Sequence, residues 1–199
     1  MARLEGKNIL IIIPKDYYDE QELEIPLKKF REEGATVRIA SSKLKEAVGM
    51  KTGRVMPDLI VVDAMEGITG DSYVTSSKGT RQVLGVFHAV VIIGGRGTRK
   101  HVWTDKLVRL LIMDRFRSAM VIAGIGQGVP ALGVAGLLEN IEVAAPHDKH
   151  TLPELDKAAA ILVEENLVVH DNIITAVGAE VAEEFAEAII EAVMKTSKK

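Results

Sequence analysis

One glycine-rich turn has the spacing of a catalytic motif but lacks the side chain that such a motif presents. Residues 121–138, VIAGIGQGVPALGVAGLL, pass from an apolar strand pattern through Gly-Ile-Gly-Gln-Gly into a helical pattern. A glycine-x-nucleophile-x-glycine turn between a strand and a helix is a nucleophile elbow, which exposes its central side chain to a substrate. The central position here is Gly126. The pattern therefore predicts an elbow backbone without a nucleophile.

Two further turns could meet this elbow. The first is the pair Gly94-Gly95, followed by Arg96, at the end of an apolar run. Glycines there let the backbone approach a ligand and present N–H groups, as in an oxyanion hole or an anion nest. The second is the acidic run DYYDE (16–20), which contains Asp19 and begins where the first helix is expected. Negative charge at a helix start also complements the helix dipole, so a purely structural role stays open.

Apolar runs typical of strands alternate with helical patterns along the chain. The expected strands are NILIII (8–13), TVRIAS (36–41), DLIVVDA (58–64), HAVVIIGG (88–95) and SAMVIAGI (118–125). The expected helices are QELEIPLKKFREEG (21–34), TDKLVRLLIMDRF (104–116, with Thr104 as N-cap) and VPALGVAGLL (129–138). Residues 166–195 indicate a hairpin, with its turn at Asp171-Asn172, and then a long amphipathic helix. Residues 66–82 are polar and loop-like, with a helix from about residue 76 as an option.

This alternation favours an α/β fold with a mostly parallel sheet. Right-handed crossovers place helices on both faces, which predicts a flavodoxin-like (Rossmann-like) three-layer sandwich. We expect one domain over residues 1–199, because no linker, repeat or low-complexity segment interrupts the pattern. In such folds ligands bind at the carboxyl edge of the strands, where all three turns arrive.

Composition excludes several classes of function. The 199 residues include no cysteine, which removes disulfides, thiolate metal sites and cysteine catalysis together. The net charge of −3 provides no basic field for nucleic acid. No signal peptide is visible and no stretch approaches the ~18 apolar residues that span a bilayer, so we expect a cytoplasmic protein without nucleic-acid or membrane partners. Scarce Asn and Gln beside many charged residues fit a thermophile.

Four stretches resemble the ThiJ/PfpI family of cysteine-dependent hydrolases, close to its PfpI-type intracellular proteases and similar to class I glutamine amidotransferases. They are EEGATVRIAS, AVVIIGGRG, AGIGQGVPALGVAGLL and DNIITAVGAEVAEEFAEAIIEAV, and the resemblance covers nearly the whole chain. The family's elbow, Ala-Ile-Cys-His-Gly-Pro, places its cysteine on Gly126 and its histidine on Gln127. The family's first-turn glutamate, which hydrogen-bonds the cysteine, falls on Asp19 when counted back from Glu22-Leu23. The resemblance also implies a homo-oligomer, a dimer or larger.

Three changes in one constellation indicate an abandoned mechanism. We interpret the chain as a PfpI-like protein that has lost the protease, amidase or deglycase activity and keeps the pocket for a small molecule or the fold for assembly. The pocket backbone would be Gly94, Gly95, Arg96, Gly126 and Gln127. Because an elbow residue commonly has φ above zero, we expect the turn to keep that geometry, with glycine relieving the strain.

Two other functions stay open. In the first, the chain is an enzyme with Asp19 as general base and backbone N–H groups near Gly95 and Gln127 as oxyanion donors. In the second, a flavodoxin-like module binds the phosphate of a nucleotide or flavin with GGRGTRK (94–100) or GIGQG (124–128). A complete G-x-G-x-x-G and a P-loop Lys-Ser pair are missing, which counts against the second. We expect no metal and no cofactor.

The side chains that could replace the missing nucleophile and base are few. His88 and His170 are expected at the periphery, whereas His101, His147 and His150 could face the same rim. A metal site at residues 147–150 matches no template spacing. The hydroxyl residues without an evident partner histidine are Thr75, Ser76 and Ser77. The aromatic residues expected near the rim are Tyr17, Tyr18 and Trp103.

Overall fold

A seven-stranded sheet forms the centre of the molecule. The computed structural model describes residues 2–65 and 86–197. The sheet comprises β1 (Asn8–Ile12), β2 (Thr36–Ser41), β5 (Leu59–Ile60), β6 (Ala89–Ile92), β7 (Val121–Ile125), β10 (Leu167–His170) and β11 (Ile173–Ala176). Its order is β10-β11-β7-β6-β1-β2-β5, and every neighbouring pair is parallel except β10 with β11. This confirms the predicted mostly parallel, flavodoxin-like α/β sandwich and the predicted hairpin near the end of the chain.

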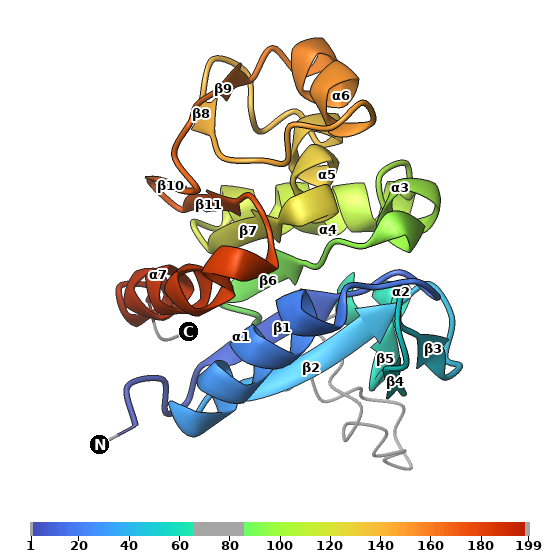
Figure 1. Cartoon of the computed structure of the whole chain (residues 1–199). Helices are drawn as coiled ribbons and strands as arrows, with labels where there is room; N and C mark the ends of the chain where they lie inside the picture. The colour runs from blue at the N-terminus through green and yellow to red at the C-terminus, as the bar shows by residue number, and fades with distance from the viewer. Residues whose placement is uncertain (1, 66–85, 198–199) are drawn as a thin grey trace.

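Helices cover both faces of the sheet (Figure 1). Helices α1 (Glu20–Glu32) and α7 (Ala182–Met194) pack side by side on one face. Helices α2 (Val61–Met65), α4 (Lys106–Arg117) and α5 (Val129–Val134) cover the other face. The remaining elements are α3 (Arg96–His101), α6 (Thr151–Lys157), the strand pairs β3 (Ala47–Val48) with β4 (Arg54–Val55) and β8 (Glu142–Val143) with β9 (Ile161–Leu162), and two 3-10 turns, Gly126–Gly128 and Ala179–Val181.

The sequence of β1 is apolar from Ile9 to Ile12 because both faces of this strand are buried. Ile9 and Ile11 face the core beneath α1 and α7, whereas Leu10 and Ile12 face the core beneath α4 and α5. Successive side chains of a strand point to opposite faces, so a strand covered on both sides needs apolar residues at every position.

One predicted strand and two predicted helices begin or end at other residues in ways that matter for the fold. The strand expected over 58–64 ends at Ile60, and the chain turns at once into α2. Helix α4 begins one residue later than predicted, because the Asp105 carboxylate, not Thr104, accepts the N–H groups of Leu107 and Val108. Helix α5 ends at Val134 instead of 138. The segment 66–82, with its optional helix, lies outside the described residues.

The carboxyl ends of β1, β6 and β7 bring the three predicted turns together. The Asp19 N–H donates to the Gly94 carbonyl over 3.0 Å, and the Gly97 N–H donates to the Tyr17 carbonyl over 3.1 Å. The turn after β1 is therefore fastened to the turn after β6, beside the turn after β7. In the described part of the chain, no helix has the length and apolarity that a membrane span requires.

Candidate functional site at the elbow

The turn after β7 has the backbone of an elbow. Gly126 has φ of +56°, in the left-handed region that side-chain-bearing residues rarely adopt, and it begins the 3-10 turn that leads into α5. The preceding residue, Ile125, is still extended. The sharp strand-to-helix geometry expected from the sequence is therefore present, and glycine removes most of its strain.

A carboxyl group occupies the space in front of this turn. An ideal Cβ added to Gly126 would overlap with Oε1 of Glu22. The other oxygen, Oε2, accepts the Gly94 N–H over 2.8 Å, and only 5% of Glu22 is exposed. The Glu22 side chain thus stands where an elbow side chain would begin.

Asp19 has a different place from the one expected. Its Oδ1 accepts the N–H groups of Gln21 (3.0 Å) and Glu22 (3.1 Å), so it is the N-cap of α1. Asp19 does line the same cavity, but Glu22, one helical turn further on, is the residue that contacts the elbow. Residues 19 and 22 match the spacing of a capping box, but the Asp19 N–H donates to the Gly94 carbonyl and Glu22 accepts the Gly94 N–H, so no local signal in the sequence separates the two acidic residues.

The environment of Glu22 favours its neutral form. Burial raises its pKa to about 8, and the negative charge of Asp19 acts in the same direction, while the hydrogen bond from Gly94 opposes both. At pH 7 most molecules therefore carry a protonated Glu22. A neutral carboxyl can donate a hydrogen bond as well as accept one, which an ionised carboxylate cannot do.

Gln127, which the sequence resemblance aligns with a histidine, is held by hydrogen bonds from its side chain and from its carbonyl group. Its side-chain Nε2 donates to Asp148 over 2.5 Å, and its carbonyl accepts the Trp103 Nε1–H over 2.5 Å. Asp148 also accepts the N–H groups of His150 and Thr151 and the Thr151 hydroxyl. Burial raises the pKa of Asp148, but these hydrogen bonds outweigh it and the net shift is downward. An amide cannot take up a proton at neutral pH, so Gln127 supplies polarity and position only.

A cavity of about 350 Å³ lies over the elbow. Its lining includes four of the five residues predicted for the pocket backbone, which are Gly95, Arg96, Gly126 and Gln127, and it also includes Asp19. Gly94 lies behind Glu22 and is needed there without a side chain, because a Cβ on it would stand 2.7 Å from the Gln127 nitrogen. In the described residues, neither the Gly95 N–H nor the Gln127 N–H donates to a protein acceptor. Two backbone donors are thus available to a ligand beside the Glu22 carboxyl.

The other candidate side chains lie as follows. His150 lines the cavity, His147 is exposed nearby, and His101 ends α3. His88 is 2% exposed at the opposite, amino end of β6, and His170 lies on the edge strand β10. Residues 75–77 lie outside the described part of the chain. Across the described ranges 2–65 and 86–197, no cluster of three or more His, Asp or Glu could hold a metal ion.

The aromatic residues expected at the rim separate into exposed and buried. Tyr17 is 45% exposed, and the Arg96 guanidinium lies 4.4 Å from the centre of its ring. Tyr18 is a core residue, and Trp103 is largely buried by its contact with Gln127.

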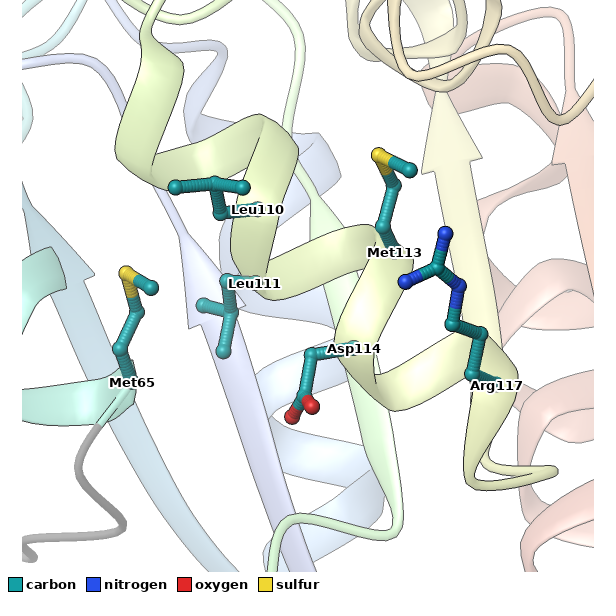
Figure 2. Close-up of a pocket in the computed structure, with 6 residues that line it drawn as sticks. All are labelled: Met65, Leu110, Leu111, Met113, Asp114 and Arg117. Carbon is teal, nitrogen blue, oxygen red and sulfur yellow. The ribbon is translucent and has the colours of Figure 1, made fainter.

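A second hollow, of about 340 Å³, lies between α2 and α4, and Figure 2 shows Met65 facing Leu110 and Leu111 across it. Its acidic residue, Asp114, is ion-paired with Arg115 over 2.5 Å and is largely exposed. This hollow therefore lacks the buried, available polar group that distinguishes the elbow cavity.

The fold of this chain is shared with known proteins. The profile of the DJ-1/PfpI family matches residues 7–192. This chain belongs to the DJ-1/PfpI family. An uncharacterized protein of Methanocaldococcus jannaschii is 27% identical over 193 residues, which cover 97% of this chain and 85% of that protein.

Solved structures agree with this assignment. The ThiJ/PfpI domain protein of Brachyspira murdochii is 26% identical and superposes with a TM-score of 0.80 over 97% of this chain and 99% of that one. Drosophila melanogaster DJ-1beta, 20% identical, has a TM-score of 0.73 over 97% and 91% of the two chains and shows the shared fold. The family resemblance drawn from the sequence is confirmed, and the absence of any cysteine agrees with a replaced catalytic cysteine.

Proposed function

We propose that this DJ-1/PfpI-family protein does not perform cysteine-dependent hydrolysis and instead binds a small molecule in the elbow cavity. The observation that supports this proposal most strongly is that the Glu22 carboxyl occupies the space in front of Gly126. A neutral Glu22 and the N–H groups of Gly95 and Gln127 together offer hydrogen bonds to a carbonyl or hydroxyl group of a ligand. The chain has no thiol, so a covalent thioester step is not available to it.

The experiment compares the wild-type protein with Glu22→Gln and Glu22→Ala. Native mass spectrometry of the purified protein is expected to show a bound small molecule, and a thermal-shift screen of small carbonyl and hydroxyl compounds should identify further ligands. We expect Glu22→Ala to lose binding and Glu22→Gln, a neutral isostere, to keep part of it. Glu24→Gln, on the exposed side of the same helix, is the matched control. Binding that is equal in all three variants would contradict a role for Glu22.

The hydrolase activity itself is tested separately. Peptide, amide and glyoxal-adduct substrates should give no turnover that iodoacetamide inhibits, because that reagent acts on thiolates. Robust turnover of any of these substrates would mean that another nucleophile has replaced the cysteine.

A second candidate function is proton transfer, with Glu22 in the role that we first considered for Asp19. The observation in its favour is the pKa of about 8, because a general base is most effective when its pKa lies near the working pH. The two backbone N–H groups would stabilise an enolate oxygen. Its test is deuterium exchange at the α-carbon of small aldehydes and ketones in D2O, followed by NMR. Exchange should rise with pH through about 8 and disappear in Glu22→Gln.

Phosphate binding by the glycine turns, the nucleotide or flavin alternative, has less support. The N–H groups of Gly94, Gly97 and Thr98 donate to Glu22, Tyr17 and Gly95, and the Arg96 N–H donates to the Met50 sulfur. A backbone phosphate cradle needs those donors to be available.

The remaining proposals concern assembly and location. We propose a homo-oligomer in the cytoplasm, on the basis of family membership. Light scattering should give a mass at least twice the 21.6 kDa of one chain, and a mass of one chain at all concentrations would contradict it.

A further inference from the structure

Four cationic side chains gather in a groove beside the elbow cavity. Arg96, Arg99 and Lys100 come from α3, and Lys149 comes from the loop before α6. The groove has a volume of about 520 Å³, and Arg96, Arg99 and His150 line both the groove and the elbow cavity. The two hollows are therefore neighbours with shared walls, and cations stand on both sides of the groove.

These cations have no carboxylate partners among the described residues. In the part of the chain that the structure describes, no ion pair involves Arg96, Arg99, Lys100 or Lys149. The acidic residues near the groove are already engaged, because Glu154 pairs with Lys157 over 2.7 Å and Asp148 accepts four hydrogen bonds.

This arrangement is unfavourable for the protein alone. Arg96 and Arg99, three residues apart, and Arg96 and Lys100, four apart, are neighbours on one helical face, where like charges repel. Arg96 is also the first residue of α3, where the helix dipole opposes a cation. The protein as a whole carries a net charge of −3, so the cluster is not part of a general positive excess. An anion between the two walls would relieve the repulsion.

We propose that the groove binds the anionic group of the molecule whose other end occupies the elbow cavity, an inference that rests on the proposed function. The ligand class is then a small molecule that carries a phosphate or another multiply charged anionic group. Side chains would hold the anion, because the N–H groups of Gly94, Arg96, Gly97 and Thr98 already have acceptors within the protein. Arg96, positioned by the Tyr17 ring, and Arg99 offer planar, two-pronged donors that match phosphate oxygens.

The probe is inorganic pyrophosphate, titrated into the full-length protein by calorimetry and by tryptophan fluorescence. The fluorescence has a single source, Trp103, which lines the groove. We expect saturable binding that weakens as NaCl is added. Arg99→Gln and Lys149→Gln should each weaken it about tenfold, the effect of one charge-assisted contact. The control is Arg109→Gln, an exposed arginine of α4 outside the groove, which should bind pyrophosphate as the wild type does.

Each outcome has a defined meaning. Absence of saturable calorimetric binding at low salt, or an equal loss in Arg109→Gln, overturns the proposal. Single-stranded DNA that binds more tightly than pyrophosphate, with the same residue dependence, also overturns it in favour of a nucleic-acid surface. If the binding of a cavity ligand depends on Glu22 but not on Arg99 or Lys149, the proposed function is supported and the proposed role of the groove is contradicted. If pyrophosphate binding depends on the groove residues but the protein binds no ligand over Gly126, the groove is an anion site and the proposed function is contradicted.

Discussion

Two buried titratable residues stand at opposite ends of the same sheet, and only one of them belongs to a site. His88, at the amino end of β6, has its Nδ1 satisfied by the Asn8 N–H over 3.0 Å, and burial lowers its pKa. Glu22, at the carboxyl end, is buried to a similar degree, but it lines a cavity, and only one of its oxygens has a hydrogen-bond partner in the described part of the chain. Burial shifts the pKa of both groups toward the neutral form. Unused hydrogen-bonding capacity beside an open space is what makes Glu22 a candidate for function.

The largest expected effect comes from replacing the titratable carboxyl group of Glu22 with an amide. Its folded pKa, about 8, lies above its ordinary value of 4.5, so the unfolded chain releases this proton first as pH rises. Wild-type stability should therefore fall between pH 4.5 and pH 8, by on the order of 4 kcal/mol from this group. Glu22→Gln should lack this fall. Chemical denaturation from pH 4.5 to 9 measures the difference, and a Glu24→Gln curve that differs from wild type in the same way would contradict the assignment.

Gly126→Ala should have the next largest effect, about 3 kcal/mol of lost stability. The substitution adds a Cβ at a positive φ and also drives it into the Glu22 carboxyl. Gly136→Ala is a matched control, because Gly136 has φ of +80° and open space around it, and it should cost about 1 kcal/mol. In a Glu22→Ala background the two substitutions should cost the same. A persistent difference there would mean that Glu22 is not the obstacle.

His88→Ala tests the other end of the sheet, with an expected loss of about 2 kcal/mol because the Asn8 N–H is left without its acceptor. The folded pKa of His88 lies below the ordinary 6.5, so the unfolded chain binds this proton more readily. Wild-type stability should then decrease as pH falls below 6.5, and the variant should lack that decrease. Binding in the elbow cavity should not change. His170→Ala, on the exposed part of β10, should be neutral in the same denaturation series.

The smallest expected effect separates Asp19 from Glu22. Asp19→Asn keeps a good N-cap, so stability should change by less than about 0.5 kcal/mol. Loss of the Asp19 charge should lower the pKa of Glu22, since that charge is one of the causes of its upward shift. Carbon-detected NMR titration of the Glu22 carboxyl measures this. Asp105→Asn, an equivalent cap on α4, should leave the pKa of Glu22 where it is.

The fold was predictable because its strands are covered on both faces. Runs such as those at β1, β6 and β7 are apolar at nearly every position, and such runs separated by helices indicate a parallel sheet. The same rule failed at 58–64, where the apolar run 59–62 continues as helix α2 after two residues of strand. Residues with high strand propensity are helical there, which shows tertiary context overriding local preference.

The candidate site was predictable only in its backbone. Glycine spacing placed the elbow and the 94–95 turn correctly, because only glycine tolerates those backbone conformations and close approaches. The choice between Asp19 and Glu22 depends on which side of a helical turn faces the strand ends, and counting along the sequence does not determine this. The cationic groove joins α3 to Lys149, which are about fifty residues apart, so no local pattern reveals it.

The space that Glu22 occupies also bears on how this chain could change over generations. A cysteine at Gly126 would meet the Glu22 carboxyl group in the volume that its Cβ requires. The Glu22 side chain would have to rotate, or be replaced, for the new residue to be accommodated. A thiol at this elbow therefore requires two changes, one that adds the side chain at position 126 and one that moves the Glu22 carboxyl group.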